Sequence, residues 1–160
     1  VIEEVLRQDV QIIILGKGDS SYENYFTDLA RRYVGKFVAV IAFNPDLSRK
    51  IYSGADLFLM PSKSEPCGLS QMIASRYGTV PIVRETGGLY DSIKPVGNGG
   101  NGFTFANYNA YDMLYVIREA INCYYNKDFW PELMKRVMSV DFSWQRSAKE
   151  YEKVYGEMLK

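Results

Sequence analysis

The sequence predicts an α/β fold in which helices cover both faces of a parallel sheet and the chain ends in helices. Short apolar and β-branched runs alternate with helical patterns as far as residue 107, and this alternation is typical of βαβ units. The strand patterns then stop, and three helical patterns follow. A length of 160 residues with 47% hydrophobic residues fits one compact domain.

Five strands are expected, and the first carries the strongest pattern. The strands span residues 10–15, 37–42, 56–60, 80–83 and 102–106. The first is the run Val10-Gln-Ile-Ile-Ile-Leu15, closed by Gly16, and such a run is typical of a strand buried on both faces. We therefore expect it to lie in the centre of the sheet.

Helices are expected between and after these strands. One runs from Tyr22 to Tyr33 with Asp19 or Ser20 as its cap. The others span residues 45–53, 68–77, 110–125, 129–138 and 143–159. In the helix at 68–77, the side chains expected to face the core are Leu69, Met72, Ile73 and Tyr77. Residues 1–7 resemble the end of a helix already under way, so we expect the first strand of the fold to lie upstream of this chain.

The composition argues against several classes of function. Nineteen basic residues balance nineteen acidic ones, so no strong field attracts nucleic acid or an anionic membrane. No apolar run approaches the roughly 20 residues that span a bilayer. Histidine is absent, which excludes Ser-His-Asp, Cys-His and His-metal sites within the chain. Because no Asp-x-Asp pair occurs either, we expect chemistry without a metal or a cofactor. Cys67 and Cys123 are expected to be free thiols in a reducing compartment.

The loop after the third predicted strand places a carboxylate just before a helix. It reads Pro61-Ser-Lys-Ser-Glu-Pro-Cys-Gly-Leu-Ser70, and ligands of open α/β sheets bind beyond the carboxyl ends of the strands. We expect the amides of Gly68, Leu69 and Ser70 to be unpaired donors that bind phosphate or sugar oxygens. A carboxylate next to a phosphate would repel it. Glu65 is therefore expected to contact the neutral part of the ligand, a sugar hydroxyl. The alternative is that Glu65 caps the helix.

Three further loops follow predicted strands. In Arg84-Glu-Thr-Gly-Gly-Leu89 the paired glycines permit positive φ and close backbone approach to a ligand, and the alternative is an ordinary turn. Gly16-Lys-Gly-Asp19 lacks the third glycine of a dinucleotide fingerprint, so we expect a tight turn with only a secondary binding role. Phe43 either offers a flat face to a purine base or caps the core.

Four segments together resemble bacterial glycogen synthases and plant starch synthases in order and spacing. They are 55–72 with its Glu-Pro-Cys-Gly-Leu run, 77–84, the Thr-Gly-Gly-Leu run that ends at Leu89, and the Asp-Phe-Ser-Trp run that ends at Trp144. The resemblance implies a two-domain GT-B glycosyltransferase. In such an enzyme this Rossmann-like C-terminal half, residues 1–160, binds the donor, and an absent N-terminal half binds the glucan. The helix at 143–160 is then expected to pack toward that N-terminal half.

The resemblance also implies roles for particular residues. Glu65 matches the family carboxylate that contacts the donor glucose and supports the developing positive charge, so it is the expected catalytic residue. The expected donor-binding residues are Phe43, Cys67, Gly68, Leu69, Ser70, Thr86, Gly87 and Gly88. The first matches an aromatic against adenine, the next three match the surroundings of the glucose, and the last four match those of the phosphates. Ile73 stands where many related glycosyltransferases have a second glutamate, which narrows the resemblance to glycogen synthases.

The implied activity is that of a hexosyltransferase. It moves glucose from ADP-glucose to the non-reducing end of an α-1,4-glucan with retention, through an oxocarbenium-like transition state. The isolated chain is expected to be inactive because the family's Arg and Lys of the donor site and the acceptor half lie outside it. The alternatives are a nucleotide- or nucleotide-sugar-binding module without catalysis and a structural or regulatory α/β domain. The expected location is the bacterial cytoplasm, or the plastid in a plant.

Overall fold

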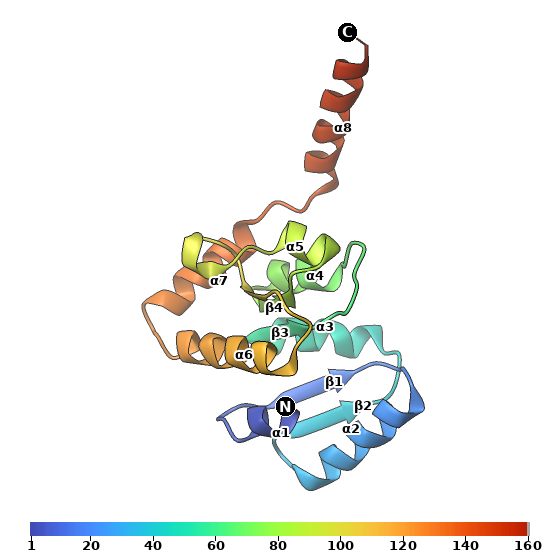
Figure 1. Ribbon diagram of the computed structural model, residues 1–160, viewed down its shortest axis with the longest axis vertical. Helices are drawn as coiled ribbons and strands as arrows, with labels where there is room; N and C mark the ends of the chain where they lie inside the picture. The colour runs from blue at the N-terminus through green and yellow to red at the C-terminus, as the bar shows by residue number, and fades with distance from the viewer. Residues whose placement is uncertain (160) are drawn as a thin grey trace.

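The computed structural model describes residues 1–159, except for the side chain of Asn98, and its strands and helices alternate as far as β5 (Figure 1). The strands are β1 (Ile12–Leu15), β2 (Phe37–Val40), β3 (Leu57–Met60), β4 (Val80–Arg84) and β5 (Phe103–Phe105). The helices are α1 (Ile2–Leu6), α2 (Ser20–Arg32), α3 (Pro45–Gly54), α4 (Ser70–Tyr77), α5 (Gly87–Ser92), α6 (Ala110–Tyr124), α7 (Phe129–Ser139) and α8 (Trp144–Met158), with a 3-10 helix η1 at Val96–Asn98. The predicted strands and helices are confirmed to within a few residues at their ends. The short helix α5 was not predicted.

The strands form two parallel sheets rather than one. β1 pairs with β2, and β4 lies between β3 and β5. Ile13 and Val38, which pair in register across β1 and β2, are 52% and 47% exposed. The prediction that the first strand is buried on both faces is therefore wrong for the described chain. Its residues pack on one side against a cluster that includes Leu29 and Phe37, because β-branched runs also suit strands covered on a single face.

The main core lies between the three-stranded sheet and helices α6 and α7. β4 is buried from Val80 to Val83, as expected for a central parallel strand with covered faces. Phe103 and Phe105 of β5 join this cluster. Ile12 of β1 contacts both this core and the cluster around Leu29, so packing connects the two sheets even though no strand pairing does.

Helix α4 turns a different face inward from the predicted one. Its buried residues are Gln71, Ala74 and Ser75, and Gly78 follows on the same stripe at helical spacing. The small side chains allow α4 to approach β4 and α7 closely. The residues that were expected to face the core are instead exposed or partly exposed. Three of them, Leu69, Met72 and Ile73, line a hollow of ≈ 670 Å³ together with residues 138–143.

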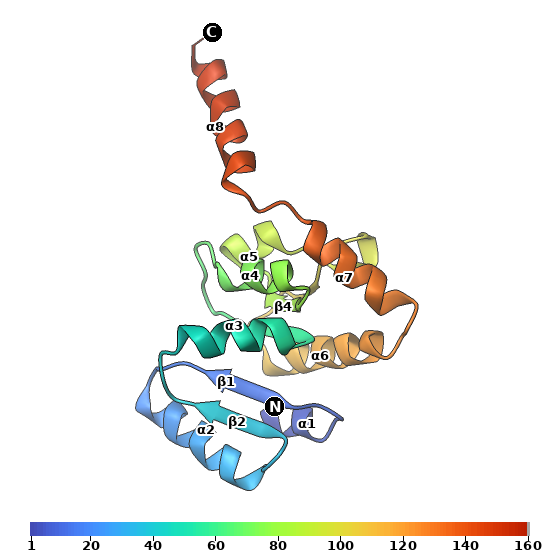
Figure 2. The ribbon, with the colours of Figure 1, turned by 180° about the vertical axis from the view of Figure 1, so that it is seen from behind.

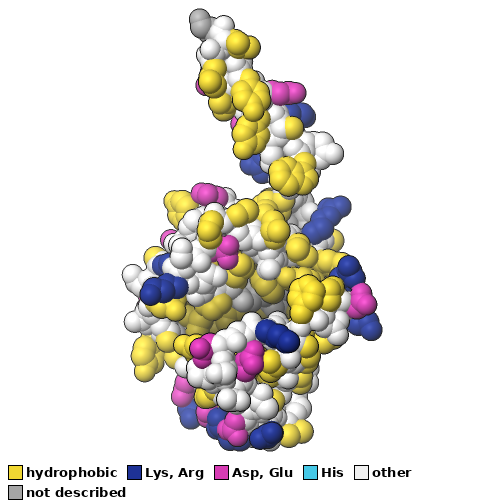
Figure 3. Space-filling view, turned by 90° about the vertical axis from the view of Figure 1, so that its right-hand side faces the viewer, with side chains coloured by type: hydrophobic (Ala, Val, Ile, Leu, Met, Phe, Trp, Pro, Cys, Tyr) yellow, Lys and Arg dark blue, Asp and Glu magenta, His cyan; other side chains and the backbone are white. Residues whose placement is uncertain are grey.

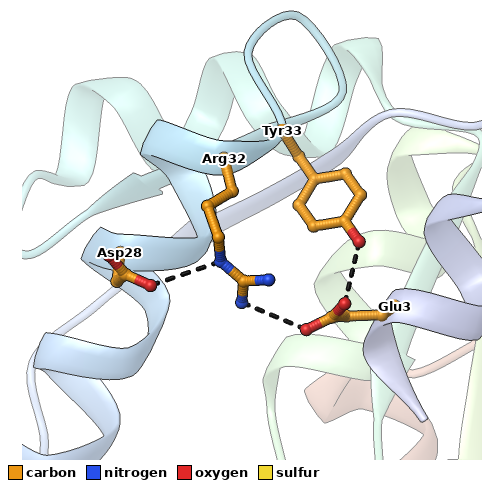
Figure 4. A network of polar contacts seen from close by, with 4 residues as sticks. All are labelled: Glu3, Asp28, Arg32 and Tyr33. Atoms are coloured by element: carbon orange, nitrogen blue, oxygen red, sulfur yellow. Dashed lines mark hydrogen bonds and ion pairs between the residues drawn. The ribbon is translucent and has the colours of Figure 1, made fainter.

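A network of polar contacts holds α1 against the end of α2 (Figure 4). The hydroxyl of Tyr33 donates to Glu3 Oε2 at 2.8 Å, and Arg32 Nη2 donates to Glu3 Oε1 at 3.1 Å. Arg32 Nε also reaches Asp28 Oδ2 at 3.3 Å. The hydrogen bond from Tyr33, and then the one from Arg32, lower the pKa of Glu3 from its ordinary value.

Helix α8 stands away from the rest of the molecule (Figures 1 and 2). None of its described residues is buried, and Figure 3 shows hydrophobic side chains exposed along it. Trp144, Tyr151 and Tyr155 are among them. These aromatic side chains therefore take no part in the core of the described chain. The expected packing of this helix toward another domain stays a prediction. No described helix is long and apolar enough to cross a membrane.

Candidate functional site

The candidate site is formed by two loops that follow neighbouring parallel strands. The Glu65 loop, residues 61–69, connects β3 to α4, and residues 85 and 86 connect β4 to α5. Because β3 and β4 are parallel and paired in register, both connections leave the same edge of the sheet. Figure 1 shows the Glu65 loop projecting from this edge beside α4 and α5.

Backbone contacts join the Glu65 loop directly to the start of α5. The amide of Gly88 donates a hydrogen bond to the carbonyl oxygen of Glu65 at 3.1 Å. A Cβ atom added to Gly87 would overlap this same oxygen, and one added to Gly88 would overlap the carbonyl of Cys67. Gly87 also has a φ of 44°, in the left-handed region that favours glycine. The paired glycines therefore allow two protein loops to approach each other, a role that the sequence analysis did not assign to them.

The carboxylate of Glu65 has no partner among residues 1–159. Its side chain is half-buried and makes no hydrogen bond or ion pair with the described chain. Helix α4 begins at Ser70, and its N-cap residue, Leu69, makes no side-chain cap hydrogen bond. The alternative that Glu65 caps this helix is thus wrong. A half-buried carboxylate without a partner among the described residues is instead available to a ligand.

The predicted amide donors lie just before and at the start of α4. Gly68 is buried and has a φ of 73°, so it turns the chain into the helix rather than belonging to the first turn. No described residue accepts a hydrogen bond from the amides of Gly68, Leu69 or Ser70. Cys67 is an exposed free thiol beside them. These unpaired donors next to Glu65 form the part of the site that suits an anion.

The remaining predicted residues lie at different places. Thr86 is the N-cap of α5, and its side chain makes no cap hydrogen bond. Phe43 follows β2 and precedes the N-cap residue Asn44; its side chain is 88% exposed, so it does not cap the core. Phe43 takes no part in the contacts that join the Glu65 loop to α5, and its flat faces remain free for another ring.

Two side chains that the sequence analysis did not single out hold the Glu65 loop. Arg84, the last residue of β4, donates from Nε to the Ser62 carbonyl at 2.9 Å and from Nη2 to the Lys63 carbonyl at 2.5 Å. Gln71 Nε2 donates to the carbonyls of Cys67 and Gly68 at 3.2 and 2.8 Å. Gln71 could have been noticed in the sequence, because it lies at helical spacing from the small residues Ala74 and Ser75 and so shares a helix face with them.

The sequence of the chain matches one family of enzymes. Residues 1–135 match the family model of the glycosyl transferases group 1, and the chain belongs to this family. It is 50% identical over 163 residues to the glycogen synthase of Geobacillus thermodenitrificans and 49% identical over 162 residues to that of Clostridium novyi. These alignments cover 100% and 99% of the chain and 34% of each relative. The chain thus spans about a third of the length of the curated relatives it matches.

A solved structure supports the same assignment. The catalytic domain of starch synthase IV from Arabidopsis thaliana, bound to ADP and acarbose, superimposes with a TM-score of 0.87 and 36% identity, over 98% of this chain and 34% of that one. Sucrose-phosphate synthase from Thermosynechococcus elongatus shares the fold at a TM-score of 0.68 with 20% identity, over 99% of this chain and 41% of that one. The predicted resemblance to glycogen and starch synthases and the predicted fold class are confirmed.

Proposed function

We propose that this chain is the donor-binding part of a longer glycogen or starch synthase. That enzyme is a hexosyltransferase that moves glucose from ADP-glucose to the non-reducing end of an α-1,4-glucan with retention. The observation that carries the proposal concerns Glu65, a half-buried carboxylate without a partner in the described chain. It lies in the same short segment as the unpaired amides of Gly68, Leu69 and Ser70. The relatives named glycogen synthase, at 49–50% identity, support the same activity.

The site has separate places for the neutral and the charged parts of a nucleotide sugar. A carboxylate repels phosphate, so Glu65 contacts the glucose and supports the positive charge that develops on it as the bond to the diphosphate breaks. The amides before α4 face the diphosphate, whose negative charge grows as it leaves. Fixed backbone donors stabilise such charge because they need no reorganisation when it appears. No step of this mechanism uses a metal or a cofactor.

Phe43 and the remaining partners complete the proposal. The exposed ring of Phe43 stacks on the adenine of the donor, since a free aromatic face suits a purine. The glucan binds in the cleft between this chain and the N-terminal half of the enzyme, toward which α8 packs. The protein works in the bacterial cytoplasm, or in the plastid if it comes from a plant.

The test measures glucose transfer by the full-length polypeptide, with ADP-glucose and UDP-glucose at matched concentrations. The wild-type protein should elongate an α-glucan and prefer ADP-glucose. Glu65→Ala should lower turnover by about 100-fold or more, which is the effect of removing one transition-state contact, without changing the thermal unfolding temperature. Glu132→Ala is the control, because this exposed carboxylate on α7 pairs only with Lys135 among the described residues.

Two outcomes would contradict the proposal. Near-normal turnover of the Glu65→Ala variant with ADP-glucose would remove this residue from the mechanism. Binding of ADP-glucose by the full-length protein without any elongation of glucan would favour the alternative of a nucleotide-sugar-binding module without catalysis.

A further inference from the structure

Gln71 is a fully buried polar side chain beneath the Glu65 loop. Its exposed fraction is 0%. Its side-chain nitrogen Nε2 lies 2.8 Å from the carbonyl oxygen of Gly68, 3.2 Å from that of Cys67 and 3.0 Å from the hydroxyl of Ser92. The two N–H groups of the amide are therefore shared among three acceptors. One side chain of α4 thus connects two peptide groups of the loop to helix α5.

Ser92 extends this connection to the start of α5. Its hydroxyl accepts from Gln71 and donates to the carbonyl oxygen of Gly88 at 2.6 Å. The amide of the same glycine donates to the carbonyl of Glu65. The Glu65 loop and the first turn of α5 are therefore joined by a closed set of hydrogen bonds that passes through Gln71.

The geometry of the peptide group determines what these contacts do to the site. In a trans peptide the carbonyl and the following N–H point in opposite directions, and every described peptide bond is trans. Because Gln71 holds the Cys67 carbonyl toward itself, the amide of Gly68 points away from Gln71. Its hydrogen bond to the Gly68 carbonyl does the same for the amide of Leu69. These are two of the three amides that lack an acceptor in the described chain.

The same side chain explains why a glycine stands at position 68. The backbone of Gly68 has a φ of 73°, and a Cβ atom there would lie 2.5 Å from Gln71 Oε1. This oxygen is buried without a hydrogen-bond partner in the described chain. Such an unpaired acceptor opposes folding. Gln71 therefore contributes less to stability than its three contacts suggest, and its clearest effect is on the orientation of the loop.

We propose that Gln71 is a positioning residue that holds the peptide groups 67–68 and 68–69 so that the amides of Gly68 and Leu69 face the diphosphate of the donor. The inference rests on the proposed function, since it assigns these amides to that ligand. Gln71 itself does not touch the donor, so its removal changes the affinity for the donor through the loop and leaves the affinity for the glucan unchanged.

The experiment compares Gln71→Met with Thr79→Val in the full-length protein. Thr79 is the matched control because its side chain is also buried and its hydroxyl donates to two backbone carbonyls, those of Tyr52 and Ala55. It lies immediately before β4, at the opposite end of that strand from the Glu65 loop. Both variants lose a buried hydrogen-bond donor that is shared between backbone carbonyls. Only Gln71→Met removes contacts with the Glu65 loop.

Gln71→Met should raise the KM for ADP-glucose by about 10-fold, the equivalent of one lost hydrogen bond to a charged group, and leave the KM for the glucan unchanged. Gln71→Met and Thr79→Val should lower the thermal unfolding temperature to a similar extent. Thr79→Val should nevertheless leave both KM values unchanged. An unchanged KM for ADP-glucose in Gln71→Met, or an equal rise in Thr79→Val, would overturn the inference.

Two further results are decisive. If Gln71→Met does not fold, Ser92→Ala replaces it and should raise the KM for ADP-glucose by about 3-fold, because it loosens the same network by one neutral hydrogen bond; an unchanged KM would overturn the inference. If the wild-type protein neither binds nor uses a nucleotide sugar, the proposed function itself fails and this inference fails with it.

Discussion

Two polar networks in this protein join segments that are far apart in the sequence, and they differ in their exposure to water. The network around Glu3 connects α1 to α2 through long charged side chains, and Glu3 and Arg32 are 42% and 44% exposed. The network around Gln71 connects the Glu65 loop to α5 through a buried amide and backbone groups. Water competes for the first set of contacts and is excluded from the second.

The difference shows which network can determine a binding geometry. Exposed ion pairs contribute little and weaken with salt, so the contacts of Glu3 align two helices without fixing any group within narrow limits. Buried hydrogen bonds to backbone carbonyls fix the orientation of individual peptide groups. The structure places the second kind of network beneath the loop that carries Glu65.

The largest effect is expected from Gly88→Ala. The new methyl group would overlap the carbonyl oxygen of Cys67, so α5 and the Glu65 loop would have to separate. We expect a loss of at least about 2 kcal/mol of unfolding free energy, measured by denaturant titration. Gly54→Ala is the control, because a Cβ at this position in α3 meets nothing within 4 Å. Equal stability of the two variants would show that the two loops are not docked as described.

The smallest effect is expected from Glu3→Gln, which tests the exposed network. Because the folded-state pKa of Glu3 is lowered, chiefly by the Tyr33 hydroxyl, its contribution to stability is fully present above the unfolded-state pKa of about 4.3 and is lost as the pH falls through the lower folded value. The variant should therefore unfold at a slightly lower temperature than the wild type at pH 7 and at the same temperature at pH 2. A difference that persists at pH 2 would mean that the ionised carboxylate is not the source of the contribution.

The local parts of the fold could be predicted from the sequence. The strand patterns and the cap at Asp19, whose Oδ1 accepts from the Ser21 amide at 2.8 Å, depend on neighbouring residues alone. The division of the strands into one sheet of β1 and β2 and another of β3, β4 and β5 could not be predicted. An apolar β-branched run is compatible with one covered face or two. The prediction of which face of α4 points inward was also wrong. Periodicity alone predicted that the large apolar side chains of this helix face the core. The small side chains of Ala74 and Ser75 face it instead, because they allow closer packing.

The candidate site could be predicted only in part. The position of Glu65 after a strand, together with the family resemblance, indicated where a ligand would bind. The docking of its loop on Gly87 and Gly88 could not be predicted, because a glycine pair is equally compatible with an ordinary turn. The contacts of Gln71 with Ser92 span 21 residues, and nothing local to either residue indicates them.

The most direct test of the account is a titration of the ¹⁵N-labelled chain with ADP, followed through its backbone amide resonances. We predict that the largest shifts belong to Gly68, Leu69 and Ser70, the amides without an acceptor in the described chain, while Gly54 in α3 does not shift. Saturable shifts confined to residues outside the Glu65 loop and α5 would contradict the claim that this loop is the donor site.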